Sequence, residues 1–130
     1  MPRVYTLATA ALTLGVPIKW LDNTLSHIKV RGVIQARQGV ARRISIDGML
    51  ILAIATLLIN EIGIPLGTAI EIAETLADNQ GEYASRQGVA IRLDLEKLRS
   101  TVLERLENAV EIAPAPRRGR PPKTKTGRLD

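Results

Sequence analysis

The sequence predicts a mainly α-helical fold with two small β-hairpins, and three observations support this fold class. Apolar residues recur at helical spacing along most of the chain before Pro114. Two short stretches instead alternate apolar and polar residues around an Arg-Gln-Gly turn, which predicts a β-hairpin in each. The first hairpin has strands near 33–36 and 40–44, and the second has a strand at 89–93. Glycine and proline punctuate the chain between these stretches. A length of 130 residues suits one compact domain, or two very small units that share a core.

The first two predicted helices are short and lie close together in the chain. The first begins after Thr6, a suitable N-cap, and its apolar residues at helical spacing are Leu7, Ala10, Ala11 and Leu14. Gly15 ends this helix, and Pro17 suits the first turn of the next one. The second helix has its own apolar stripe, formed by Ile18, Leu21, Leu25 and Ile28. Two short helices joined by a glycine turn are the signature of a helix-turn-helix.

The middle of the chain predicts the central core helix. Ser45 is placed to cap a helix that runs to about Glu61, and this helix is apolar on nearly every face. Gly63 ends it, and Pro65 opens a further helix with an apolar stripe. A last helix, at about 95–112, has apolar residues along one side and is too short to require a coiled coil.

A repeat at an offset of 48 or 49 residues relates the two parts of the chain. Leu-Gly-Val-Pro-Ile at 14–18 matches Ile-Gly-Ile-Pro-Leu at 62–66, and Arg-Gln-Gly-Val-Ala occurs at 37–41 and again at 86–90. Agreement at several turns favours true duplication over a chance likeness of two hairpins. The repeated order of helix, Gly-x-Pro turn, helix and hairpin is that of a winged helix-turn-helix.

We therefore expect tandem winged helix-turn-helix units closed by a C-terminal helix. The first unit spans 1–45, and the second unit with the last helix spans 46–113. Ser45 and Asp94 cap the helix that follows each hairpin. The remainder, 114–130, is rich in proline, glycine and cations and has nothing to bury, so we expect it to be disordered when free.

Charge is grouped along the chain. The net charge is +4 over residues 1–64, −4 over 65–113 and +5 over 114–130, which gives +5 for the whole chain. An even scatter of charge would indicate solubility only. The grouping instead predicts two separate anion-binding surfaces, one in the first unit and one in the tail.

Several functional classes are disfavoured by composition. The absence of cysteine removes disulfides and thiolate chemistry and fits a reducing, cytoplasmic compartment. The apolar run at 49–59 is too short to span a membrane, and the N-terminal 15 residues only faintly resemble a signal peptide. His27 is the only histidine, and Glu71 with Glu74 fits a solvated helix face, so we expect neither an enzyme nor a bound metal or cofactor.

The first unit is the candidate DNA reader, because the second helix of a helix-turn-helix enters the major groove. Opposite its apolar stripe this helix carries Lys19, Asp22, Asn23 and Ser26. Asparagine can pair with adenine, and aspartate can accept from the cytosine amino group or pair instead with a nearby arginine. The second unit has Gly67, Glu71 and Glu74 in place of Lys19, Asn23 and Ser26. Carboxylates there would repel phosphate, so the second unit more plausibly supports the core or an interface.

Cations surround the predicted reading helix on the first hairpin and on its approach. We expect these to contact phosphates: Lys29, Arg31, Arg37, Arg42 and Arg43. Arg37 and Gln38, at the hairpin turn, could also reach the minor groove. The alternative is that these polar residues are ordinary solvated side chains, and the charge grouping favours DNA contact.

The segments 5–30, 42–45 and 57–73 resemble the winged-helix DNA-binding domain of MerR-type regulators and their excisionase-like relatives. The resemblance covers about residues 5–77. It implies that Lys19 lies in the major-groove helix and that Arg42 and Arg43 lie on the wing strand. It further implies that the helix at about 95–112 pairs two subunits, so we expect a homodimer.

The tail contains a second candidate DNA-binding segment. Its sequence Arg-Arg-Gly-Arg-Pro-Pro-Lys resembles an AT-hook, in which proline keeps the strand extended and glycine admits the backbone to a narrow A·T minor groove. The residues expected to bind there are Arg117, Arg118, Gly119, Arg120 and Lys123. The alternative is a basic tail that makes unspecific phosphate contacts.

Together these patterns predict a protein that binds double-stranded DNA, with a preference for A·T-rich sites, as a transcriptional regulator in the nucleoid. One alternative is an architectural nucleoid protein, which would differ in its specificity ratio and not in its contacts. A different class of alternative is a protein-interaction adaptor that uses the acidic second unit, with the tail as a targeting or RNA-binding segment.

Overall fold

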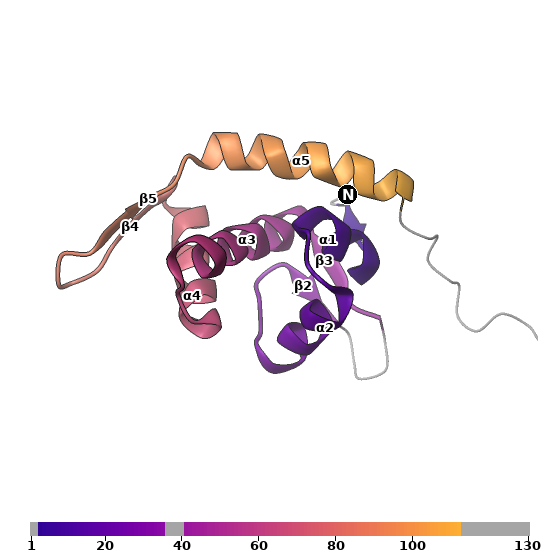
Figure 1. Ribbon diagram of the computed structural model, residues 1–130, viewed down its shortest axis with the longest axis horizontal. Helices are drawn as coiled ribbons and strands as arrows, with labels where there is room; N and C mark the ends of the chain where they lie inside the picture. Colours follow the sequence, from indigo (N-terminus) through magenta and orange to yellow (C-terminus); the bar gives the residue numbers. More distant parts are fainter. Residues whose placement is uncertain (1–2, 36–40, 113–130) are drawn as a thin grey trace, which may run out of the picture.

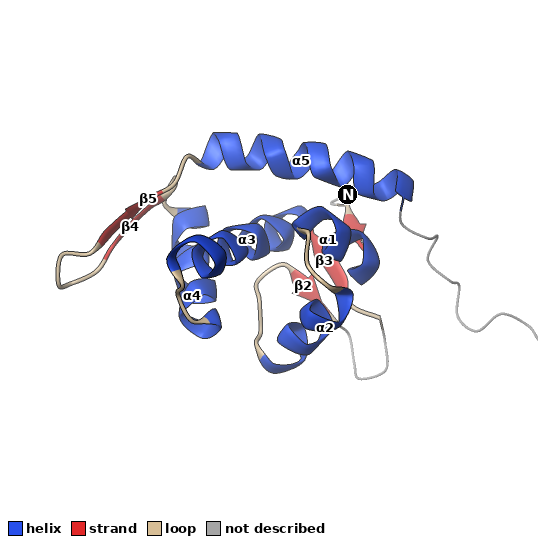
Figure 2. Cartoon of the chain, viewed as in Figure 1, coloured by secondary structure: helices blue, strands red, loops and turns tan. Residues whose placement is uncertain are grey.

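The computed structural model describes residues 3–35 and 41–112. Their elements, in chain order, are β1 (Val4–Tyr5), α1 (Leu7–Leu14), α2 (Ile18–His27), β2 (Val33–Ile34), β3 (Arg43–Ser45), α3 (Ile46–Leu57), the π-helical turn η1 (Leu58–Ile62), α4 (Leu66–Asp78), β4 (Glu82–Ala84), β5 (Ala90–Arg92) and α5 (Leu95–Ile112). This part is mainly helical with small antiparallel sheets, which confirms the predicted class (Figure 2). The predicted tail and the tip of the first hairpin lie outside the described residues.

Local capping explains where the helices begin. The Oγ1 of Thr6 accepts a hydrogen bond from the Thr9 amide at 3.2 Å, and the Oγ of Ser45 accepts one from the Gly48 amide at 3.1 Å. The Oδ1 of Asp94 accepts from the backbone amide three residues on, at 3.0 Å. All three caps were predicted from the sequence, and each satisfies an amide that the first turn of a helix leaves unpaired.

The core surrounds α3, which lies between α1 and α4 and beneath α5 (Figure 1). Its residues from Gly48 to Ala55 are all buried, because neighbouring elements cover every side of the helix. The predicted helix to about Glu61 is confirmed in extent, but its last five residues form the π turn η1. Gly63 then ends the helix in the left-handed conformation, as expected.

The last helix, α5, crosses the molecule and covers α1 and α3 (Figure 1). Val102, Leu106 and Ala109 are buried in this contact, whereas Leu103 and Val110 face outward. The apolar stripe noted in the sequence is therefore used within the chain itself to cover the core.

Two antiparallel sheets accompany the helices. The first has the strand order β1-β3-β2, with Tyr5 opposite Ile44 and Ile34 opposite Arg43. Strand β1 was not predicted, and it makes this sheet three-stranded. The second sheet pairs β4 with β5, and this hairpin projects from the helices (Figure 1). The described strands are shorter than the sequence suggested.

Apart from β1, which has no counterpart among the described residues of the second half, the two halves share their element order and their turn geometry. Gly15 and Gly63, at matching positions, both adopt the left-handed conformation with φ of 69° and 76°. Gly32 and Gly81 have φ of 89° and 85°, and a side chain on either would collide with backbone. The halves differ at η1, where the π turn adds a residue to the helix. Leu14 is 7% exposed, whereas its counterpart Ile62 is 61% exposed.

The described residues contain no helix that could span a membrane. None of the helices within 3–35 and 41–112 combines the length and the hydropathy that crossing a bilayer requires.

Candidate nucleic-acid interface

Helix α2 presents one apolar and one polar face. Leu21 and Thr24 are buried against the core, and Leu25 is half-buried. The four residues predicted to face outward are all exposed: Lys19, Asp22, Asn23 and Ser26. Among the described residues, the side chains of Lys19 and Asn23 make no hydrogen bond or ion pair, so both are available to an external partner.

Arg42 is held against α2 by two contacts. Its Nη1 donates to Asp22 Oδ1 in an ion pair, and its Nη2 donates to Ser26 Oγ at 2.9 Å. The Ser26 hydroxyl in turn donates to the Asp22 carbonyl oxygen at 2.8 Å. The Arg42 side chain is only 15% exposed, against 52% for Asp22. Of the two roles considered for Asp22, pairing with an arginine is the one present in this structure.

The neighbouring arginine, Arg43, lies on the other side of the sheet. Side chains alternate along a strand, and Ile44 is fully buried on the core side of β3. Arg43 is therefore on the outer face, beside its cross-strand partner Ile34, which is 56% exposed. The structure brings Arg42 to α2 and places Arg43 on the outside of the hairpin.

Arg31 forms a bidentate ion pair with the last residue of α4. Its Nη1 and Nη2 donate to the two carboxylate oxygens of Asp78 at 2.7 and 2.8 Å. The hydrogen bonds with Arg31 lower the pKa of Asp78, and the same bonds raise the pKa of Arg31. This pair joins the loop after α2 to the second half of the chain, so Arg31 is engaged before any phosphate approaches.

A shallow hollow of about 340 Å³ lies at the C-terminal end of α2. Lys29, Gln35 and Arg42 contribute its polar lining, together with His27, whose Nδ1 lies 2.8 Å from the Asn23 carbonyl oxygen. This oxygen can only accept, so Nδ1 carries the proton. Lys29 is exposed, so it is the cation of this hollow that is free to meet an anion, whereas Arg42 is already paired with Asp22.

The corresponding surface of the second half is acidic. On α4, Glu71 is exposed and Glu74 is half-buried, at the positions that match Asn23 and Ser26. Two further predicted groups lie outside the described residues. They are the hairpin tip with Arg37 and Gln38, and the tail with Arg117, Arg118, Gly119, Arg120 and Lys123.

The sequence reasoning overlooked a cluster of polar residues on α5. Lys97, Thr101 and Arg105 are spaced by four residues, which places them on one side of the helix, facing a cleft. The sequence shows this spacing, but the helix was interpreted from its apolar residues alone. Within the described ranges, no cluster of three or more His, Asp or Glu side chains is placed to hold a metal ion.

Comparisons with protein-family models, with curated proteins and with solved structures find no match for this chain.

Proposed function

We propose that this chain is a transcriptional regulator that binds double-stranded DNA through α2. The observation that carries the proposal is the outward face of α2, where Lys19 and Asn23 are exposed and have no partner among the described residues. An α-helix of this kind fits the major groove. Asn23 suits bidentate pairing with adenine, and Lys19 suits guanine or a flanking phosphate.

We further propose that the two halves are winged helix-turn-helix units with different tasks. The shared glycine conformations and the shared order of helices and strands support the proposal that the two halves are units of the same type. In the first unit the β2–β3 hairpin would follow the DNA backbone, with Arg43 on the hairpin and Lys29 on its approach as phosphate contacts, and with Arg42 as a contact only once it is released from Asp22. The second unit would serve the core, since its helix α4 carries acidic residues where the first unit carries its reading face.

In this proposal the tail adds affinity for A·T-rich minor grooves through its AT-hook-like segment. A homodimer through α5 would use the outward residues Leu103 and Val110, because Val102 and Leu106 are already buried within the chain. An architectural nucleoid protein would make the same contacts. A binding selection on random duplexes, with and without residues 114–130, separates the two, since a sharp consensus indicates a regulator and A·T enrichment alone indicates an architectural role.

Two substitutions test the groove assignment. We expect Asn23→Ala to blunt sequence preference, because the variant loses its pairing with a base edge. We expect Arg43→Ala to weaken binding to all sequences and to lower the salt slope by about one unit, because it removes one phosphate contact. Fluorescence anisotropy with a selected and a scrambled duplex, over a range of salt concentrations, measures both effects.

Asn108→Ala, at an exposed position of α5, is the matched control and should leave both quantities unchanged. Equal effects of Asn23→Ala and Arg43→Ala on every sequence would contradict the groove assignment. Failure of the unmodified protein to bind duplex DNA at moderate salt would favour the adaptor alternative.

A further inference from the structure

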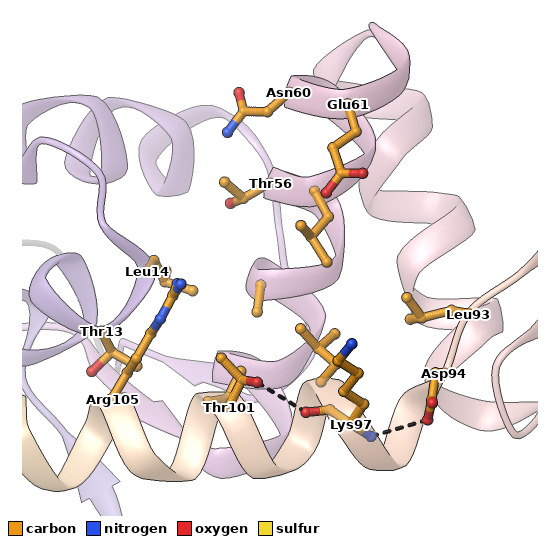
Figure 3. Close-up of a pocket in the computed structure, with 14 residues that line it drawn as sticks. Thr13, Leu14, Thr56, Asn60, Glu61, Leu93, Asp94, Lys97, Thr101 and Arg105 are labelled. Carbon is orange, nitrogen blue, oxygen red and sulfur yellow. Dashed lines mark hydrogen bonds between the residues drawn. The ribbon is translucent and has the colours of Figure 1, made fainter.

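A cleft of about 430 Å³ lies between α5, α1 and the helix formed by α3 and η1 (Figure 3). Pockets that hold small molecules in proteins are commonly between 300 and 1,000 Å³ and combine apolar walls with a few convergent polar groups. The volume and the apolar walls are present here together with several polar groups, and none of these features depends on the proposed binding of DNA.

The apolar walls come from α1, α3 and α5 and from the short link between β5 and α5. They are formed by Leu14, Ala53, Leu57, Leu93, Leu98 and Val102. Their apolar surface can be removed from water by a hydrocarbon chain, which is favourable in proportion to the area buried.

The polar groups of the cleft differ between its two sides. Lys97 and Arg105 extend from α5, whereas Asn60 and Glu61 extend from η1 (Figure 3). Lys97, Arg105 and Glu61 are charged, and none of them forms an ion pair with another described residue. The fourth charged residue of the lining, Asp94, already uses Oδ1 to cap α5.

The hydroxyl groups in the cleft have little donor capacity left. Thr13 and Thr56 donate to the carbonyl oxygens four residues earlier, each at 2.8 Å, and Thr101 donates likewise to Lys97 O at 3.0 Å. A hydroxyl has a single proton to donate. The remaining donors are the Asn60 amide on the η1 side and the charged groups of Lys97 and Arg105 on the α5 side, and these charges favour an anionic group on the α5 side.

The π turn η1 forms part of this cleft. Such turns are rare, and they occur frequently at functional sites because the extra residue redirects nearby side chains. Here the turn contains Asn60 and Glu61, both of which line the cleft, and it leaves Ile62 61% exposed to solvent. The matching end of α1 is a regular helix that buries Leu14. The second copy thus exposes an apolar residue where the first buries one.

We propose that this cleft binds a small amphipathic carboxylate. Its apolar chain would lie against the leucine side chains of the cleft, and its carboxylate would accept hydrogen bonds from Arg105 and Lys97. Glu61, across the cleft, would keep the carboxylate on the α5 side by like-charge repulsion. An arginine suits this role because its planar guanidinium can donate two parallel hydrogen bonds to one carboxylate.

Three probes with the same chain length and different head groups test the proposal: octanoate, octylamine and octanol. Each is titrated into the full chain below its micellar concentration, with two-dimensional amide NMR as the readout. We expect octanoate to bind most tightly and to shift the amide signals of cleft residues such as Thr13, Thr56 and Thr101. Equal or tighter binding of octylamine or octanol, or shifts confined to another surface, would overturn the proposal.

Two variants that should change the affinity for octanoate in opposite directions make the test more specific. Arg105→Gln should weaken octanoate binding by roughly tenfold or more, since it removes a charge-assisted hydrogen bond. Glu61→Gln should tighten octanoate binding, since it removes the opposing carboxylate. Arg99→Gln, an equal charge change at an α5 residue that does not line the cleft, is the control. The same loss in Arg99→Gln as in Arg105→Gln would show that only net charge matters and would refute the site. All three positions are exposed, so the variants should fold.

Discussion

Asp22→Asn is the substitution that most directly tests the proposed contact between the α2 surface and DNA. In the structure the Asp22 carboxylate forms an ion pair with Arg42, and a phosphate must compete with it for this guanidinium. Asparagine keeps the shape of the side chain and one acceptor oxygen, but it removes the negative charge. We therefore expect the variant to bind duplex DNA more tightly at low salt, with Arg42 as an added phosphate contact.

The magnitude follows from counterion release. Each phosphate neutralised by a protein cation steepens the salt dependence of the binding constant by about 0.9 on a double-logarithmic scale. A rise from 50 to 200 mM salt should thus cost Asp22→Asn about 3.5-fold more affinity than it costs the unmodified protein. Folding stability should fall by about 1 to 2 kcal/mol, because Arg42 is only 15% exposed and loses an ion pair, while asparagine keeps an acceptor oxygen for its guanidinium.

The assay is a salt titration of anisotropy with a selected and a scrambled duplex. Glu104→Gln, at an exposed position of α5, has the same charge change and serves as the control. An unchanged slope in Asp22→Asn, or an equal change in Glu104→Gln, would refute the competition between phosphate and Asp22. A loss of binding to the selected duplex alone would instead show that Asp22 reads a cytosine.

Two further predictions concern stability, and urea denaturation measures both. Leu14→Ala should lower the free energy of unfolding by about 2 to 5 kcal/mol, because Leu14 is 7% exposed. Ile62→Ala, at the matching position, should change it by about 0.5 kcal/mol or less, because Ile62 is 61% exposed. Equal losses would contradict the difference in burial between the two positions. Asp78→Asn should be less stable than the unmodified protein at pH 6, with the difference vanishing as the pH falls. The pKa of Asp78 is lowered in the folded state, so the contribution of its carboxylate is complete above the ordinary value of 3.8 and is lost as the pH falls through the folded pKa. A difference that persists at pH 2 would show that charge pairing with Arg31 is not its cause.

The helix boundaries could be predicted because they depend on short-range chemistry. A cap such as Thr6 or Ser45 bonds to an amide three residues away, and Gly15 adopts a conformation that other residues resist. These interactions need no knowledge of the rest of the chain. The same applies to α3, whose apolar character on every side requires burial.

What the sequence did not predict depends on long-range contacts or on competition between hydrogen-bond patterns. Strand β1 has two residues, too few for an alternating pattern, and it exists because β3 pairs with it. The π turn has no residue signature. The ion pair of Arg31 with Asp78 joins positions 47 apart, and sequence alone does not select one of the nine acids in residues 65–113 as the partner of this arginine. Of the features that were missed, only the polar cluster of Lys97, Thr101 and Arg105 could have been predicted from the sequence, because its spacing of four residues is typical of one helix face.

The ion pairs divide the proposed DNA contacts into two kinds. Arg31 is bound to Asp78 and Arg42 to Asp22, so each must exchange an internal carboxylate for a phosphate and gains less from DNA than a free cation does. On the described surface around α2, the cations without such partners are Lys19 and Lys29, with Arg43 on the outer side of the hairpin. Residues 114–130 carry a net charge of +5. Unspecific affinity should therefore come mostly from the tail, and α2 should contribute mainly the choice of sequence, because phosphate contacts supply binding strength and base contacts supply discrimination.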